Sequence, residues 1–153
     1  MIIPSWYPEQ EQAEKITDFI LWYSRYEYAL KNSGYQRKGV KDLEPDWSAF
    51  INYLNSSKLP IPKPLEEALS YLKEKPVEKQ LSDKVWRPVI RDSDWEWLIR
   101  SLTTVRNNLF HGGKQGESKL LDKERDRILI NICQDIMQEV YKICPPEVQD
   151  FLS

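Results

Sequence analysis

The chain has 153 residues, 41% of them hydrophobic and 12% aromatic, which suffices for one packed domain and is too short for two. We therefore expect a single helical domain over residues 1–153. The formal charge of −2 excludes a strongly basic body that holds nucleic acid over a broad surface, so any such contact must be focal.

The sequence also indicates where the protein resides. No stretch approaches the roughly 18 uninterrupted apolar residues of a membrane span, and the N-terminus lacks the basic and apolar regions of an export signal. The only cysteines, Cys133 and Cys144, fall in one predicted helix, about 16 Å of helix rise apart and beyond disulfide reach. We expect two free thiols, a reducing cytoplasmic location and no membrane contact.

Helical periodicity dominates the first half of the chain. Apolar positions recur at three- and four-residue spacing from Pro8 to Ser33, which predicts a long amphipathic helix. A loop rich in Gly, Lys and Arg leads to a shorter helix at DWSAFINYLNSS, with Asp46 as its N-cap. The prolines of KLPIPKP end that helix, and a third is expected over residues 65–75.

Two more helices are predicted after an irregular passage that extends up to VWRPVIRD. The fourth starts at Asp92 or Ser93 and continues until Gly112 and Gly113, and the fifth spans about residues 120–143 and ends at the following prolines. No strand alternation or hairpin signal competes, so we expect an all-α fold, a bundle of four to five helices. The apolar stripes are Trp95, Leu98, Leu102, Val105 and Leu109 in the fourth helix and Ile128, Ile132, Ile136, Val140 and Ile143 in the fifth.

The end of the fourth helix, VRNNLFHGGK, carries the candidate chemistry. His111 is the only histidine, Asn107 lies one turn before it on the same face, and Arg106 is beside Asn107. In the last turn the negative end of the helix dipole favours an imidazolium, so His111 can exchange a proton near neutral pH. Metal-free RNA cleavage needs a base for the 2′-hydroxyl, an acid for the leaving oxygen and positive charge on the transition state.

Spacing alone leaves a structural interpretation open. A histidine followed by two glycines is a common helix stop, with a cation placed to suit the dipole, and an arginine one turn earlier is usually solvated or paired.

The segment RNNLFHGGK resembles the signature of HEPN (higher eukaryotes and prokaryotes nucleotide-binding) domains, an all-α superfamily, and WYSRYEYALKNSGY resembles the opening of that superfamily. The resemblance implies a HEPN-like bundle and a metal-independent endoribonuclease without cofactor, working as a homodimer in a toxin-antitoxin or phage-defence system. It implies that His111 is the acid/base group, that Arg106 stabilises the phosphate and transition state, and that Asn107 positions them. A homodimer also supplies the second histidine that the two proton transfers need.

RNA is therefore the expected partner, together with a possible antitoxin or nucleotidyltransferase. Some HEPN toxins carry a tyrosine two positions after the histidine, which a nucleotidyltransferase antitoxin modifies, and Gly113 occupies that position here. Two alternatives remain open. One is a non-catalytic HEPN module that binds nucleotides or RNA or serves as a partner subunit. The other is a structural helical adaptor, with Arg106 and His111 turned to solvent or held in separate ion pairs.

Several residues have supporting roles in these hypotheses. Lys114 and Lys119 flank the motif and are expected to bind RNA phosphates. Glu27, on the buried stripe of the first helix, either orients Arg106 or pairs with Arg25 or a lysine, and the second interpretation is favoured. A solvated face is favoured over phosphate binding for the loop cations Arg37, Lys38 and Lys41.

Aromatic residues and metal ligands complete the candidates. Trp86, Trp95 and Trp97 are expected in the core or an interface rather than stacked on bases, with Trp95, Leu98 and Leu102 as candidate dimer contacts. One histidine and two separated cysteines leave only carboxylates for a metal, so no metal site is predicted.

Overall fold

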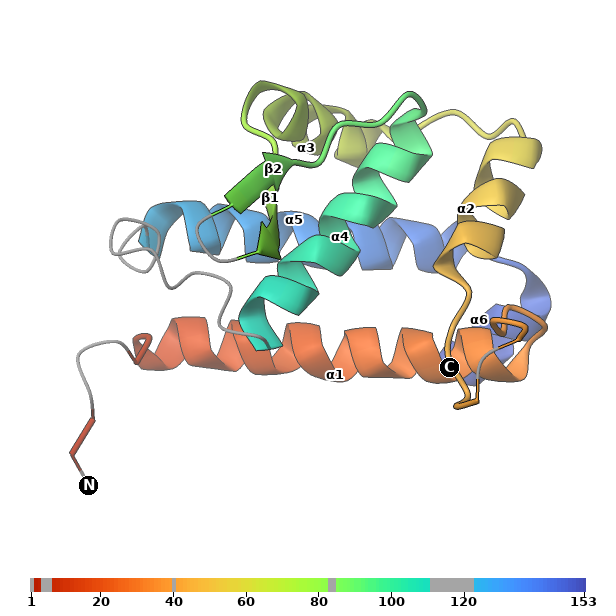
Figure 1. Cartoon of the computed structure of the whole chain (residues 1–153), viewed down its shortest axis with the longest axis horizontal. Helices are drawn as coiled ribbons and strands as arrows, with labels where there is room; N and C mark the ends of the chain where they lie inside the picture. Colours follow the sequence, from red (N-terminus) through yellow and green to blue (C-terminus); the bar gives the residue numbers. More distant parts are fainter. Residues whose placement is uncertain (1, 4–6, 40, 83–84, 111–122) are drawn as a thin grey trace.

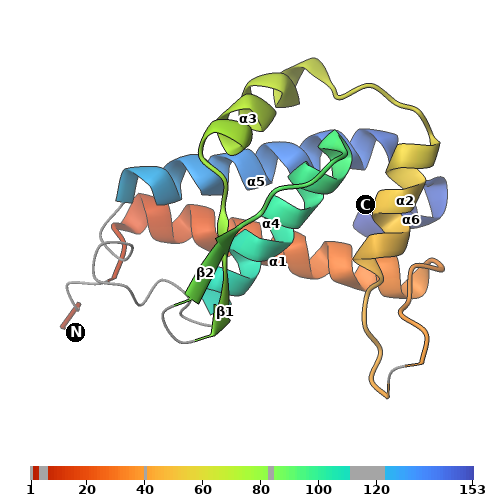
Figure 2. The ribbon, with the colours of Figure 1, turned by 45° about the horizontal axis from the view of Figure 1, so that its top comes forward.

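A computed structural model describes residues 2–3, 7–39, 41–82, 85–110 and 123–153. The described chain is mostly helical, with one small sheet (Figure 1). Two long helices, α1 (Gln10–Asn32) and α5 (Lys123–Ile143), lie side by side (Figures 1 and 2). The helix α4 (Asp94–Phe110) crosses obliquely, packs on α5 and brings its C-terminal end to α1.

Three shorter helices pack against the long ones in the described chain. Both α2 (Trp47–Ser56) and α3 (Lys63–Glu74) pack against α4, and α3 also contacts α5. The last helix, α6 (Pro146–Leu152), packs against α1. The mostly helical fold was predicted, and the boundaries agree with the expected ones to within a few residues wherever the structure describes them.

Polar caps fix where two of the helices begin. The Asp46 carboxylate accepts a hydrogen bond from the Ala49 backbone N–H at 2.9 Å, as predicted for the start of α2. The Ser93 hydroxyl accepts one from the Glu96 N–H at 3.0 Å, so Ser93 rather than Asp92 caps α4. Both caps satisfy N–H donors that have no partner within the helix.

The core contains side chains from all six described helices. The Tyr26 hydroxyl, buried within it, donates a hydrogen bond to the Met137 carbonyl and joins α1 to α5. Burial of the apolar side chains in this core is the main force that holds the helices together. Its fully or nearly fully buried members include Phe19, Leu30, Phe50, Leu54, Leu65, Leu72, Leu98, Ile99, Leu102, Ile130, Ile136 and Val148.

The expectation that no hairpin would occur was wrong. An antiparallel pair, β1 (Glu78–Ser82) and β2 (Val85–Pro88), occupies part of the passage interpreted as irregular. Most of its side chains are exposed, so the strands lack the alternation of apolar and polar residues that a half-buried sheet requires. The hairpin is anchored at its base, where the Val89 N–H donates to the Val77 carbonyl at 2.7 Å and both side chains are buried.

The prediction of four to five helices also missed α6. The pair Pro145-Pro146 ends α5, as predicted, but Pro146 also occupies the first position of a new helix. Proline is tolerated there because the N–H it lacks would have no partner in the first turn. A proline pair that terminates one helix can therefore begin the next.

Several predicted core and interface residues can be placed. The side chains of Trp95, Leu98 and Leu102 are all at most 4% exposed and lie in the core. They therefore cannot form the dimer contact for which they were candidates. Trp86 and Trp97 are half-buried, and Trp97 packs against the core.

Both cysteines are free, as expected from their spacing, and both are buried. Burial raises the pKa of the Cys144 thiol to about 11. Within the described part of the chain, no helix combines the length and apolar character needed to cross a membrane.

Candidate functional site

An open groove of about 1090 Å³ lies where α1, α2 and α4 meet the loop between α1 and α2. Its lining carries six cationic side chains and four carboxylates, although the whole chain has a net charge of −2. Positive charge is therefore concentrated here, as expected of a focal anion contact. The cations are Arg37, Lys38, Lys79, Arg91, Arg100 and Arg106, and the carboxylates are Glu27, Glu44, Asp46 and Glu96.

Arg106 is held from several sides at the end of α4. Its Nη2 lies 3.7 Å from the Oε1 atom of Glu27, and its Nη1 donates a hydrogen bond to the Asn107 side-chain oxygen at 3.0 Å. The guanidinium carbon lies 5.6 Å from the ring centroid of Tyr23 and 4.5 Å from that of Phe110. These contacts restrict the guanidinium to one region of the groove.

Arg106 keeps hydrogen-bonding capacity in this arrangement. A guanidinium has five N–H donors, and the contacts above use one hydrogen bond and one longer ion pair. The Nε atom is buried and has no acceptor among the described residues. Donors on the two Nη atoms therefore remain for an anion that enters the groove.

Glu27 faces the groove rather than a partner on its own helix. Its ion pair is with Arg106, not with Arg25 or a lysine as favoured from the sequence. Arg25 lies on the exposed side of α1, where its guanidinium carbon is 4.8 Å from the Tyr28 ring centroid. The alternative that Glu27 orients Arg106 is the one compatible with this geometry.

Tyr23 lines the groove beside Arg106 and stays neutral. Burial, reinforced by the Glu27 carboxylate, raises the pKa of Tyr23 well above its ordinary value, and Arg106 only partly opposes this shift. The phenol therefore presents an uncharged ring to Arg106, and the carboxylate partner of Arg106 is Glu27.

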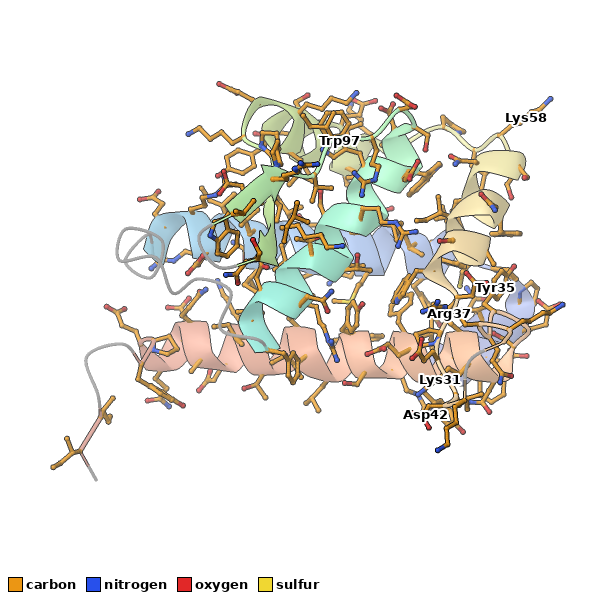
Figure 3. The ribbon with its side chains drawn as sticks, in the orientation of Figure 1. Lys31, Tyr35, Arg37, Asp42, Lys58 and Trp97 are labelled. Atoms are coloured by element: carbon orange, nitrogen blue, oxygen red, sulfur yellow. The ribbon has the colours of Figure 1, made fainter. Side chains whose placement is uncertain are left out.

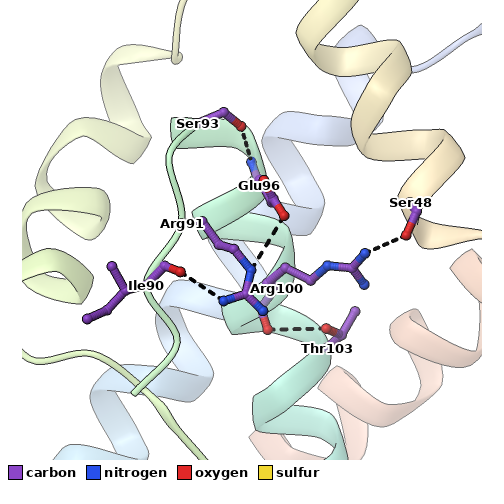
Figure 4. A network of polar contacts seen from close by, with 7 residues as sticks. All are labelled: Ser48, Ile90, Arg91, Ser93, Glu96, Arg100 and Thr103. Carbon is purple, nitrogen blue, oxygen red and sulfur yellow. Dashed lines mark hydrogen bonds and ion pairs between the residues drawn. The ribbon is translucent and has the colours of Figure 1, made fainter. Parts of the chain in front are cut away.

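A polar stripe on α4 lines the groove beyond Arg106. Glu96, Arg100, Thr103 and Asn107 recur at helical spacing, and all four line the groove. Figure 4 shows Arg100 reaching across from α4 to α2, where its Nη2 donates to the Ser48 hydroxyl at 2.6 Å. Sequence reasoning followed the apolar stripe and missed this one, although its spacing is visible in the sequence.

A second arginine beside this stripe is already neutralised. The Arg91 Nε lies 3.4 Å from the Glu96 Oε1 atom, and Arg91 Nη1 donates to the Ile90 carbonyl at 2.8 Å (Figure 4). Arg91 also lines the groove, and it was not predicted. Its charge is compensated locally, which distinguishes it from Arg100.

The loop cations divide between the groove and the surface. Arg37 and Lys38 line the groove, whereas Lys41 is exposed outside its lining. Arg37 forms an ion pair with Glu44 at 2.9 Å across the base of the loop, and Figure 3 places it beside the C-terminal part of α1. The side chains of this pair are 57% and 45% exposed, so the predicted solvated face describes it well.

Three predicted site residues, His111, Lys114 and Lys119, lie outside the described residues. His111 follows Phe110, the last residue of α4, directly in the sequence. Of the remaining candidates, the structure brings Arg106, Asn107 and Glu27 together in one groove. In the described part of the chain, no group of three or more histidine, cysteine or acidic side chains could hold a metal ion.

No protein-family model matches the chain, and no curated protein or solved structure is significantly similar to it.

Proposed function

We propose that the protein is a HEPN-type, metal-independent endoribonuclease that cleaves RNA in this groove. One observation carries the proposal: the Arg106 guanidinium is held in a cation-rich groove by Glu27 and Asn107, with donors to spare. Arginine suits a phosphodiester because its planar fork matches two phosphate oxygens. His111, five residues further along the sequence, supplies the proton-transfer group.

The proposed reaction is transesterification within the RNA strand. The 2′-oxygen attacks the adjacent phosphorus, its proton passes to a neutral histidine, and the bond from phosphorus to the 5′-oxygen breaks. A protonated histidine gives its proton to the departing 5′-oxygen, so the products are a 2′,3′-cyclic phosphate and a 5′-hydroxyl. Arg106 stabilises the charge that builds on the equatorial phosphate oxygens, and Asn107 and Glu27 position Arg106.

Two histidines are needed for these roles, so we propose that the active species is a homodimer in which each chain supplies one His111. A two-fold axis brings the same surface of each subunit together. Because Trp95, Leu98 and Leu102 lie in the core, other apolar side chains must form the contact. Light scattering is expected to give about twice the chain mass of 18.2 kDa, and activity per chain should fall on dilution.

The decisive experiment incubates the purified protein with labelled RNA in EDTA and identifies the product ends. We expect cleavage by the wild type and none by His111→Ala or Arg106→Ala, with helical circular dichroism retained in both variants. Asn107→Ala should slow cleavage without abolishing it, because a neutral hydrogen bond contributes less than the charge it positions. A 5′-phosphate product or a strict magnesium requirement would contradict the mechanism.

A non-catalytic RNA-binding module is the second candidate, and the excess of cations in the groove favours it equally. Under this alternative the wild type should bind RNA without cleaving it. His111→Ala should bind RNA as tightly as the wild type. A toxin or phage-defence role is proposed from the resemblance alone, and it predicts that induced expression arrests growth for the wild type and not for His111→Ala.

A further inference from the structure

Arg100 differs from the other arginines of the groove in its partners. Arg37, Arg91 and Arg106 each have a carboxylate within ion-pair distance, on Glu44, Glu96 and Glu27 respectively. Among the described residues, no carboxylate pairs with Arg100, which bonds only to the Ser48 hydroxyl. Arg100 therefore lines the groove without an ion-pair partner in the part of the chain that the structure describes.

Arg100 is also held in position. The bond to Ser48 joins α4 to the first turn of α2 and fixes one Nη atom, as Figure 4 shows. The rest of the guanidinium remains available, since one hydroxyl satisfies only one of five donors. A positioned arginine without a carboxylate is suited to bind an anion, because little side-chain entropy remains to be lost.

The distance between Arg100 and Arg106 indicates the form of the anion. Six residues of α4 separate them, which corresponds to about 9 Å of helix rise. Arg106 is held towards Glu27 of α1 and Arg100 towards Ser48 of α2, so the two guanidinium groups suit two phosphates of one strand rather than a single phosphate. Thr103 lies between them along α4, and Thr103 and Asn107 both add polar groups to the groove lining.

We propose that Arg100 is a second phosphate-binding residue, which contacts single-stranded RNA at a different phosphate from the one held by Arg106. This rests on the proposed function for the identity of the substrate. A single strand is the fitting form because the site is a concave groove between helices, whereas duplexes are usually contacted by elements that protrude into their grooves. Ser48 is the positioning residue for Arg100.

The test measures binding without cleavage. A fluorescent, single-stranded 2′-O-methyl RNA lacks the nucleophile, so its anisotropy reports affinity alone, and titrations at several salt concentrations give the slope of log affinity against log salt. Removing one cation that binds a phosphate of a single strand changes that slope by about 0.7. Arg100→Gln should weaken binding about tenfold and make the slope less negative by about 0.7.

Two further variants make the result interpretable. Arg25→Gln removes the same charge from the exposed side of α1, outside the groove lining, and should change neither quantity. Arg100→Lys keeps the charge and loses the planar fork, so it should keep the wild-type slope with a smaller loss of affinity. Circular-dichroism melting checks that each variant is folded.

The outcomes separate this inference from the proposed function. If Arg100→Gln and Arg25→Gln give the same slope of log affinity against log salt, Arg100 does not bind a phosphate. This result would overturn the inference even if the wild type cleaves RNA. If the slope depends on Arg100 but the protein cleaves no RNA, the second phosphate position is supported and the proposed ribonuclease activity is refuted. If polyglutamate of equal charge displaces the RNA as well as unlabelled RNA does, the groove binds polyanions without preference for phosphate and the inference is wrong.

Discussion

Glu27→Gln removes the charge opposite Arg106 and preserves the size of the side chain. At 3.7 Å and an effective dielectric constant of about 20, two unit charges attract by about 4 kcal/mol. The Glu27 and Arg106 side chains are 24% and 27% exposed, so solvent screening and side-chain entropy reduce the net contribution to about 1 kcal/mol. Under the proposed function, an RNA phosphate at Arg106 competes with this attraction, and the Glu27 carboxylate also repels the phosphate.

We therefore expect Glu27→Gln to bind uncleavable 2′-O-methyl RNA about fivefold more tightly than the wild type, which corresponds to about 1 kcal/mol. Cleavage under saturating RNA should nevertheless slow by about tenfold or more, because glutamine no longer holds the guanidinium by charge. The melting temperature should fall by about 2–4 °C.

Anisotropy gives the affinity and single-turnover cleavage gives the rate. Glu67→Gln, an exposed change of the same kind on α3, is the matched control and should alter neither. The outcome that refutes this reasoning is a Glu27→Gln protein that binds RNA no more tightly than Glu67→Gln. In that case the ion pair does not compete with the phosphate.

Three further predictions concern the stability of the fold. Tyr26→Phe should lower the free energy of unfolding by about 1 kcal/mol in urea titrations, because the Met137 carbonyl loses a buried donor, and the exposed Tyr28→Phe should have no such effect. Burial raises the pKa of Cys144 to about 11, so stability should fall as the pH rises from about 9 towards 11, where the unfolded thiol loses its proton first. Urea titrations should show a shallower fall for Cys144→Ala, and equal falls would mean that this thiol does not contribute. Arg125→Ala should destabilise the protein by about 1–3 kcal/mol, since Arg125 donates to the carbonyls of Lys75 and Pro76 and to the Tyr71 hydroxyl, and a melting temperature equal to that of exposed Arg127→Ala would contradict this.

Helices with a sustained apolar stripe and a polar cap could be predicted from the sequence. The start of α2 illustrates this, because the signal and the stabilising interaction are the same Asp46 carboxylate. The hairpin could not be predicted in this way, since its strands bury little and it depends on contacts distant in the sequence. One of these is the hydrogen bond from the Asn108 side chain to the Glu78 carbonyl at 3.0 Å.

The candidate site was predictable where its residues are close in the sequence. Arg106 and Asn107 are adjacent, and their hydrogen bond follows from a short motif. Glu27 could be named as a candidate, but its partner could not be chosen, because the choice depends on where the end of α4 meets α1. Arg100 was missed since its significance depends on α2, which supplies the Ser48 hydroxyl.

The pairing of charges explains how a chain of net charge −2 can offer an anion site. Three of the groove's four arginines have carboxylate partners, so they add little long-range attraction for an anion. Among the described residues, Arg100, Lys38 and Lys79 have no carboxylate partner and supply the remaining positive field. Under the proposed function, the unpaired set attracts the strand and the carboxylate-held Arg106 fixes the phosphate that reacts.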